Sequence, residues 1–390
     1  MSNGKKILIV NNNLHIGGIQ KALVSMLKSM PAEYDVTLLL FQKCGELLTE
    51  IPDAVRVIEE MSRFSYLGVS QAACKQKLRR GVLAFLTRKL GFPKAVPFLC
   101  KGQKRKLLKE HFDVAVSYQH CAASRSFYGG TAEYVLHRVD AEKKVCFIHC
   151  DYQNSGTQSA YADSVYRKFD RVACVSASVR EHFLHCVPDM ADKCVVVPNA
   201  VVVEDILSAA EQEPYAYDTT YCNLLTVARL SREKGIERVL HALSKIDTSK
   251  LRYHLVGDGP QREYLKGIVN ELSLEKVVCF HGEKDNPYRY MKYADALLLP
   301  SYHEAAPVVF QEAKVLGLPI LTTDTTSAKE MVGERFGMVC ENSEQGIEAM
   351  LLKVACGDVS LDAFRKTKAC FALQGNVAFI QGIKEVFEDG

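Results

Sequence analysis

Short apolar segments alternate with longer amphipathic segments along this chain, and this alternation limits its fold more than any other feature. A strand followed by a helix, repeated many times, is typical of parallel sheets covered by helices. The alternation weakens across the polar residues 211–221 and then restarts. The expected strands are residues 7–10, 36–41, 114–117, 145–149, 172–175 and 195–197, and then 224–227, 253–256, 277–280, 296–299 and 320–322. The sequence therefore predicts an α/β protein with two doubly wound parallel sheets.

The two runs of strands predict two Rossmann-like domains that face each other across a cleft. The 390 residues suffice for two or three domains of about 100–200 residues each. We expect residues 1–199 to form the first domain and residues 200–374 the second. Within residues 375–390, apolar side chains at helical spacing predict a helix at Val377–Phe387. This helix can pack back on the first domain.

The cysteines and the apolar stretches indicate in which cellular compartment the protein is expected. Fourteen cysteines are scattered along the chain without a Cys-x-x-Cys pair, whereas a structural zinc site needs clustered ligands and a thiol-rich extracellular chain needs disulfides. The apolar residues 7–10 are too few for a signal-peptide core, and no stretch approaches the ~18–20 apolar residues of a membrane-spanning helix. We therefore expect a cytoplasmic chain with reduced thiols and no bound metal, which meets a membrane only at its surface.

Residues 63–109 form an unusually basic segment. No acidic residue occurs between Glu60 and Glu110, whereas the segment holds thirteen Lys or Arg residues. Apolar residues lie among them at near-helical spacing, namely Val82, Leu83, Phe85, Leu86 and Leu90. Such a surface is attracted to anionic lipid. A solvated basic face or a phosphate-rich acceptor site would have the same composition. Nucleic acid binding is not expected, because aromatic residues are not interleaved for base stacking.

A glycine-containing loop follows the first expected strand. Gly17 and Gly18 stand near its end, and a helix is expected after Gln20. Glycines let the backbone approach a ligand closely, and a helix N-terminus favours phosphate or sugar oxygens. The dinucleotide fingerprint Gly-x-Gly-x-x-Gly is absent. The loop is therefore either a ligand-binding turn or a plain tight turn.

Two further turns follow strands of the second run. Arg229 stands at the carboxyl end of the first of these strands and Lys234 lies just before a helix. Open α/β sheets bind ligands at such strand ends. Together the two cations could clamp a diphosphate, unless they are simply solvated loop charges. Residues 257–260, Gly-Asp-Gly-Pro, form another strand-to-helix turn, for which turn chemistry alone is a sufficient explanation.

The most informative stretch is residues 300–313. Glu304 lies in the loop after an apolar strand, and Glu312 lies eight residues further on, in the helix that Pro307 begins. Eight residues are about two helical turns, which would place both carboxylates on one face. The N–H groups around Ala305, Ala306 and Val308 would face the cleft. A carboxylate can accept hydrogen bonds from two vicinal hydroxyl groups, which suits a ribose or a hexose.

The order and separation of these motifs resemble glycosyltransferase family four, of the retaining GT-B class. The resemblance runs from the Gly17-Gly18 loop through residues 175–176 and 197–199 to the motifs of the second half. It covers nearly the whole chain and is weakest over residues 60–140. Each motif is unspecific by itself, whereas the combination is specific.

The resemblance implies roles for individual residues. Arg229 and Lys234 would bind the donor diphosphate and stabilise the charge of the leaving group. Glu312 would hold the ribose, and Glu304 would contact the donor sugar. The remaining donor-binding residues implied are Gly17, Gly18, Gly282, Glu283, Lys284, Ala305, Ala306, Pro307 and Val308. His149, at the end of a first-domain strand, would lie near the reacting centre, unless it is a satisfied strand-end histidine. No metal and no cofactor beyond the nucleotide sugar are implied.

Two departures from the family pattern concern specificity. The family usually has Glu-Gly-Phe/Leu-Pro, whereas this chain has Glu304, Ala305, Ala306 and Pro307, and the added methyl group of Ala305 could narrow the sugar pocket. Gln20 replaces a common Glu. We expect a retaining, metal-independent transferase that moves a sugar from a UDP-linked donor to a saccharide or lipid-linked saccharide, in bacterial surface polysaccharide synthesis at the inner face of the membrane. The alternatives are a sugar-nucleotide epimerase or hydrolase, and a non-catalytic partner subunit.

Overall fold

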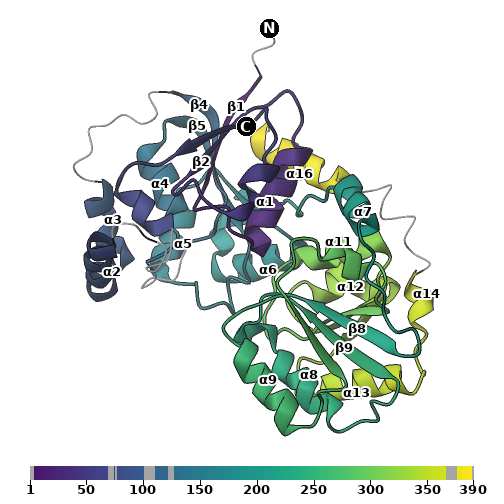
Figure 1. Ribbon diagram of the computed structural model, residues 1–390. Helices are drawn as coiled ribbons and strands as arrows, with labels where there is room; N and C mark the ends of the chain where they lie inside the picture. The colour runs from purple at the N-terminus through teal and green to yellow at the C-terminus, as the bar shows by residue number, and fades with distance from the viewer. Residues whose placement is uncertain are drawn as a thin grey trace. The chain divides into compact units, whose positions relative to one another are not determined.

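The structure, a computed structural model, describes residues 4–68, 74, 77–100, 110–121, 127–365 and 376–388. The chain forms two compact units (Figure 1). The first comprises Met1–Ala200 together with Asn376–Gly390, and the second comprises Val201–Gly375. Both are α/β units built on a parallel sheet. The two units are described separately below.

Among the described residues, the first unit contains a seven-stranded sheet in the order β3-β2-β1-β4-β5-β6-β7. The strands are β1 (Lys6–Asn11), β2 (Asp35–Leu40), β3 (Arg56–Glu59), β4 (Phe112–Ser117), β5 (Ala141–Ile148), β6 (Arg171–Cys174) and β7 (Cys194–Val196). All neighbouring pairs are parallel. The strand order turns outward in both directions from the β1–β4 pair, which is the place where open sheets of this kind bind ligands.

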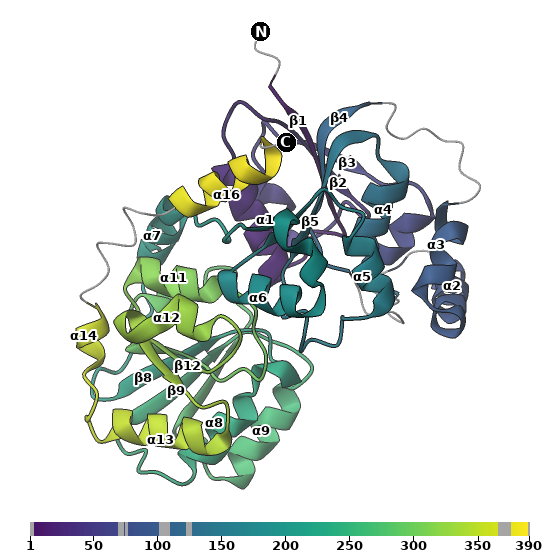
Figure 2. The same ribbon diagram turned by 180° about the vertical axis from the view of Figure 1, so that it is seen from behind.

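The helices of the first unit pack on both sides of its sheet. They are α1 (Gly18–Ser29), α2 (Lys77–Leu90), α3 (Phe92–Cys100), α4 (Thr131–Arg138), α5 (Ala160–Tyr166), α6 (Ala177–Cys186) and α16 (Val377–Phe387). The helices α1 and α16 lie side by side and share one apolar core with β1, β2 and β4 (Figure 1). The C-terminal helix is therefore part of the first unit. Helices α2 and α3 pack on each other, and α3 also contacts α4 (Figure 2).

Among the described residues, the second unit contains a six-stranded sheet in the order β10-β9-β8-β11-β12-β13. Its strands are β8 (Cys222–Val227), β9 (Leu251–Val256), β10 (Val278–Gly282), β11 (Ala296–Leu299), β12 (Ile320–Thr323) and β13 (Gly337–Cys340). Its helices are α7 (Val203–Glu211), α8 (Ile236–Leu243), α9 (Arg262–Glu271), α10 (Tyr288–Met291), α11 (Val308–Leu316), α12 (Ala328–Phe336), α13 (Glu344–Ala355) and α14 (Leu361–Arg365).

Alternation along the strands gives the second sheet two apolar cores. In β11, Ala296 and Leu298 face the core formed with α8, α9 and α13, whereas Leu297 and Leu299 face the core formed with α7, α10, α11 and α12. Successive side chains of a strand point to opposite faces, so a sheet covered on both faces needs an uninterrupted apolar run. The sequence of β11, Ala-Leu-Leu-Leu, has this property.

Three local predictions need correction. The sequence indicated neither β3 nor β13, and both are edge strands. The helix expected after Gln20 begins at Gly18 instead. Edge strands are exposed along one side, so the apolar runs that reveal buried strands are short or absent in them. The sequence of β3, Arg-Val-Ile-Glu, begins and ends with an exposed charged residue.

Candidate functional site

The predicted donor-site segments of the second unit lie at one edge of its sheet. Residues 228–234 follow β8, residues 257–261 follow β9, residues 283–287 follow β10 and residues 300–307 follow β11. Because β10, β9, β8 and β11 are parallel neighbours, their carboxyl ends meet at this edge. The fold thus gathers segments that are up to about 80 residues apart in the chain.

Lys234 and Glu304 form an ion pair at this edge. The Nζ atom of Lys234 lies 2.5 Å from Oε1 of Glu304, and Ser301 donates to the same oxygen at 2.7 Å. The two side chains are 22% and 12% exposed, so little water screens their attraction. The structure therefore brings together two predicted site residues, and it adds Ser301 as a group that orients the carboxylate.

Arg238 fixes the loop that carries Glu304. Its guanidinium group is buried, donates to the carbonyl oxygen of Pro300, and donates to Oδ1 of Asn342 at 2.8 Å. It also lies 3.8 Å from the ring centroid of Tyr302. These contacts tie α8 to the loop after β11, so the position of Glu304 depends on the fold of the whole edge. The sequence analysis did not identify Arg238, because no local pattern distinguishes it from a surface arginine.

The helix α11 begins directly after the predicted contacts Ala305, Ala306 and Pro307. Pro307 caps the helix, and Val308 is its first residue. The two described non-glycine residues with positive φ are Glu213 and Ser273, so the alanine in place of the family's usual glycine introduces no backbone strain. In the first turn the N–H group of Phe310 donates to the carbonyl oxygen of Pro307 at 3.1 Å, and the N-terminus of a helix favours an anion or a sugar oxygen. Ala305 therefore adds a methyl group at this position without backbone strain.

Glu312 lies in the second turn of α11 and is only 5% exposed. The hydroxyl group of Tyr288, from α10, donates to Oε1 of Glu312 at 2.9 Å. The sequence analysis missed Tyr288, although it follows closely after the loop with Gly282, Glu283 and Lys284. The expected shared helical face of Glu304 and Glu312 is wrong, because the helix begins four residues after Glu304. Glu304 is placed by its loop instead.

The turn after β9 requires glycine at two positions, because neighbouring backbone leaves no room for a side chain. A β-carbon at Gly257, where φ is +141°, would lie 1.9 Å from the carbonyl oxygen of Ala228. A β-carbon at Gly259 would lie 2.4 Å from the carbonyl oxygen of Leu230. The turn therefore packs directly on the backbone that carries Arg229. It supports the loop that carries Arg229, and turn chemistry accounts for its glycines.

The other predicted residues of this edge are more open. Arg229, Glu283 and Lys284 are exposed. Gly282 has a φ of +74° at a register shift between β9 and β10, and a β-carbon there would meet no atom within 4 Å. The fold places these residues at the same edge as Glu304, and it gives them room to contact a ligand.

The predicted residues of the first unit also lie at a carboxyl edge. The loop with Gly17 and Gly18 follows β1, and His149 directly follows β5. The strands β1, β4 and β5 are parallel neighbours, so both segments lie at the same edge of the sheet. Neither glycine has a positive φ, and a β-carbon at Gly18 would meet no atom within 4 Å. The backbone at Gly18 is thus open to a ligand.

His149 is held in an apolar and aromatic environment. Its ring stacks on Phe147 at 5.7 Å and lies 4.7 Å from the ring of Tyr118. Burial, and then the nearby His120, lower the pKa of His149 to about 3. Its Nε2 atom is buried and has no hydrogen-bond partner within the described part of the chain. The imidazole is therefore neutral and has a ring nitrogen left to bond a ligand.

His120 and Cys150 are neighbours of His149 that the sequence analysis did not single out. Burial opposes ionisation of both groups, but their mutual hydrogen bond and attraction outweigh it, so the pKa of Cys150 is lowered and that of His120 is raised. Both residues follow the carboxyl ends of adjacent strands, β4 and β5, and this position could have indicated them.

The described residues contain neither a metal-binding cluster nor a membrane-spanning helix. No group of three or more His, Cys, Asp or Glu side chains is arranged there to hold a metal ion. None of the described helices combines the length and the apolar character needed to cross a bilayer.

The chain resembles known proteins in sequence and in fold. Residues 209–355 match the family of glycosyl transferases group 1. The chain is 22% identical over 372 residues, 94% of each chain, to the N-acetylgalactosamine-N,N'-diacetylbacillosaminyl-diphospho-undecaprenol 4-alpha-N-acetylgalactosaminyltransferase of Campylobacter jejuni subsp. jejuni serotype O:2.

Solved structures cover the whole fold. Anabaena Alr3699/HepE in complex with UDP and glucose matches with a TM-score of 0.68 and 19% identity, over 99% of this chain and 100% of that one. WaaG, a glycosyltransferase involved in lipopolysaccharide biosynthesis, matches with a TM-score of 0.67 and 16% identity, over 98% and 100% of the two chains. Residues 209–355, within the second unit, thus match the group 1 glycosyl transferases, and the chain as a whole has the GT-B fold of these structures.

Proposed function

We propose that this chain transfers a sugar from a nucleotide diphosphate sugar, UDP-linked, to a saccharide or lipid-linked saccharide acceptor, with retention of the anomeric configuration. The acceptor would belong to bacterial surface polysaccharide synthesis, at the inner face of the membrane. Support comes from similar proteins, which include the Campylobacter jejuni diphospho-undecaprenol N-acetylgalactosaminyltransferase named above and a putative colanic acid biosynthesis glycosyltransferase of Salmonella typhimurium. Anabaena HepE, which has a similar fold, was crystallised with UDP-glucose.

The observation that carries the proposal is the Lys234–Glu304 pair beside the N-terminus of α11. A donor diphosphate would bind Arg229 and Lys234, and the developing charge of the leaving group would be stabilised by these cations and by the helix N-terminus. Lys234 would then leave its ion pair with Glu304 and pair with a donor phosphate instead. This exchange would free the Glu304 carboxylate to accept hydrogen bonds from the donor sugar. Two protein cations supply the counter-charge, so we propose that turnover needs no added metal.

We propose that His149 positions the reacting sugar, because its neutral imidazole is unsuited to proton donation. Because its pKa is about 3, the imidazole is not in the imidazolium form near neutral pH and does not act as a general acid. We propose that its buried Nε2 makes a hydrogen bond to a hydroxyl group of the reacting sugar. Gly17 and Gly18 would let the backbone of α1 approach the same sugar or the phosphates. Both contacts would position the reactants rather than transfer a proton.

Calorimetric titration with UDP, GDP and ADP tests the donor site. We expect UDP to bind, and we expect Glu312→Ala and Arg229→Ala each to weaken binding about tenfold or more, since a charged hydrogen bond contributes ~1.5–3 kcal/mol. Arg232→Ala is the matched control, because Arg232 is an exposed arginine near Arg229 that has no proposed ligand. Failure of all three nucleotides to bind would favour a non-catalytic partner subunit.

Product analysis tests the reaction itself. With UDP-sugar and acceptor, we expect a glycoside whose anomeric proton has the configuration of the donor, at the same rate with and without a chelator. Consumption of UDP-sugar without acceptor would identify an epimerase or a hydrolase instead. An inverted product would contradict retention, and inhibition by the chelator would contradict the metal-independent proposal.

A further inference from the structure

The helix α2 has an apolar face toward solvent and polar side chains toward the protein. Leu78, Val82 and Phe85 are 83%, 53% and 58% exposed, whereas Arg80 and Thr87 are only 7% and 1% exposed. Leu86 and Leu90 are exposed as well. A surface helix of a globular protein has the opposite arrangement, with its apolar stripe facing the core. The inverted arrangement of α2 therefore indicates a partner for the apolar face.

Hydrogen bonds fix the inward side of α2. Arg80 donates through Nε to the carbonyl oxygen of Tyr66 and through a terminal nitrogen to that of Phe127, both at 3.1 Å. Its guanidinium group lies 5.2 Å from the centre of the Phe127 ring. The hydroxyl group of Thr87 donates within α2, to the carbonyl oxygen of Leu83 at 2.8 Å, so this buried hydroxyl group is satisfied without a partner outside the helix. Turning the helix to bury its leucines would break the Arg80 bonds, so the exposed face is built into the fold.

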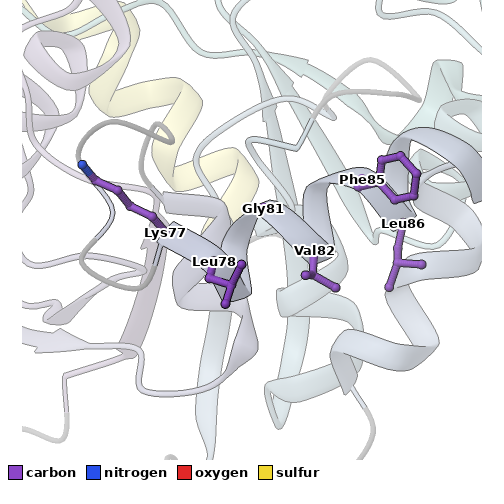
Figure 3. Close-up of a pocket in the computed structure, with 6 residues that line it drawn as sticks. All are labelled: Lys77, Leu78, Gly81, Val82, Phe85 and Leu86. Atoms are coloured by element: carbon purple, nitrogen blue, oxygen red, sulfur yellow. The ribbon is translucent and has the colours of Figure 1, made fainter.

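The apolar residues form one continuous face. At 100° per residue, Leu78, Val82, Phe85 and Leu86 fall within an arc of about 100°. A shallow hollow of about 560 Å³ runs along this arc. Figure 3 shows the six residues that line it, all of them from α2. An apolar face of this kind that is continuous and exposed marks an interaction site.

Basic side chains border this apolar face. Lys77, Arg79, Arg88 and Lys89 are exposed on the same helix, and the Nζ atom of Lys89 lies 4.9 Å from the centre of the Phe85 ring. No acidic residue occurs between Glu60 and Glu110 to offset these charges. Six more basic residues of the segment lie outside the described residues, namely Lys75, Lys101, Lys104, Arg105, Lys106 and Lys109.

Charge decides which partner fits this face. A second copy of the chain would bring the same cations face to face, since a two-fold interface uses one patch on both subunits. The cores of protein interfaces are depleted of lysine. An anionic bilayer surface offers both features that α2 needs, namely phosphate groups for the cations and an acyl boundary for the apolar side chains.

We propose that α2 docks this chain on the surface of an anionic bilayer, with Leu78, Val82, Phe85 and Leu86 inserted at the acyl boundary and the lysines and arginines on lipid phosphates. This inference deepens the proposed function, because it names the surface by which the enzyme would reach a lipid-linked acceptor. In that respect it rests on the proposed function, whereas lipid binding is measured without any turnover.

Vesicle co-sedimentation tests the inference. The full chain is mixed with vesicles of phosphatidylcholine alone or of phosphatidylcholine with phosphatidylglycerol, at low and at high salt. We expect binding to the anionic vesicles that salt weakens, and a loss of about tenfold or more in the double variant Phe85→Ser/Leu86→Ser. Lys89→Glu should weaken binding to anionic vesicles as well.

Matched controls on α13 separate lipid binding from general changes of the surface. Leu352 is 48% exposed and Lys353 is also exposed, so Leu352→Ser and Lys353→Glu make the same kinds of change elsewhere and should leave vesicle binding unaltered. Circular dichroism verifies that each variant is folded. Since the substituted side chains are exposed, we expect native spectra.

Three results would overturn the inference: absence of binding to anionic vesicles, equal binding by the α2 variants, or a change from dimer to monomer in those variants without loss of lipid binding. The last result would assign the face to a second copy of the chain. A chain that binds vesicles and transfers no sugar would contradict the proposed function and leave this inference standing. A chain that transfers sugar but does not bind vesicles would contradict this inference and leave the proposed function standing.

Discussion

At the scale of single residues, the two carboxylates of the proposed donor site are held by partners that the motif does not contain. Glu304 is held by Lys234 and Ser301, and Glu312 is held by Tyr288. A carboxylate that already accepts a well-aligned hydrogen bond is oriented before the ligand arrives, which reduces the entropy lost on binding. If the proposed donor site binds a nucleotide sugar, residues outside the motif would therefore contribute to its affinity.

The Tyr288 hydroxyl group gives a prediction at this scale. Tyr288→Phe removes one hydrogen bond to Glu312, and we expect the affinity for UDP to fall about five- to tenfold, from a loss of ~1–1.5 kcal/mol. The unfolding temperature should change little, because the ring remains. Titration calorimetry measures the affinity, and Tyr264→Phe on α9, where Tyr264 is 55% exposed, is the control. An unchanged affinity in Tyr288→Phe would show that this hydrogen bond does not serve nucleotide binding.

At the scale of elements, three neighbouring strands of the second unit share a hydrogen-bonded row of side chains. Asn223 on β8 donates to the carbonyl oxygens of Asp218 and Tyr221, so its Oδ1 must accept the bond from Nε2 of His254 at 3.1 Å. Nδ1 of His254 then accepts from Nε2 of His281 at 3.0 Å. Both histidines are neutral in this row. Burial, then His281 and Arg252, lower the pKa of His254 to about 4.

The row predicts a pH dependence of stability. Above a pH of about 6.5 the His254 imidazole is neutral in both states, whereas between about 6.5 and 4 the unfolded chain binds a proton that the folded chain excludes. Stability should therefore fall as the pH falls through this window, by up to about 1.4 kcal/mol per pH unit from this group. Denaturant unfolding at several pH values should show a shallower slope in His254→Gln. His185→Gln, at an exposed position of α6, controls for histidine loss, and equal slopes in wild type and His254→Gln would contradict the prediction.

Elements were predictable where burial makes their pattern continuous. The strands β8, β9, β11 and β12 are covered on both faces, and their apolar runs were visible in the sequence. The edge strands β3 and β13 were missed because each is partly exposed. The apolar spacing of α2 was visible as well. The face of α2 that turns inward is decided by the hydrogen bonds of Arg80 to distant carbonyl groups. The periodicity of the sequence does not reveal these hydrogen bonds.

At the scale of the whole molecule, the C-terminal segment of the chain belongs to the first unit and not to the second. The helix α16 places Phe379, Ile383, Val386 and Phe387 in the core formed with α1 and β1. Lys5 donates to the carbonyl oxygen of Phe387 at 3.0 Å. A β-carbon at Gly382 would lie 2.7 Å from the carbonyl oxygen of Val196, so glycine permits the close approach of α16 to β7. The first unit therefore includes residues from both ends of the chain.

This arrangement predicts a localised loss of stability. Phe387→Ala empties a fully buried position, and we expect about 3–5 kcal/mol less stability in the first unit, from lost burial and the cavity that remains. Amide exchange followed by mass spectrometry should speed up in β1, α1 and α16. It should stay unchanged in β8 and β11, which belong to the second unit. Val377→Ala, at a position 67% exposed on the same helix, is the control. Uniform acceleration in both units would show that they unfold as one.

The sequence by itself determined the two parallel sheets, the order of their motifs and the edges at which Gly17, His149, Arg229 and Glu304 lie. Local periodicity and turn chemistry encode these features, because the patterns of the buried strands and of the βα turns are set by residues that are neighbours in the chain. The tertiary structure alone decided the ion pair of Lys234 with Glu304, the support of Glu312 by Tyr288, the neutral state of His149 and the outward apolar face of α2. Each of these depends on contacts between residues far apart in the chain, and burial and hydrogen bonding at such contacts arise only when the chain folds.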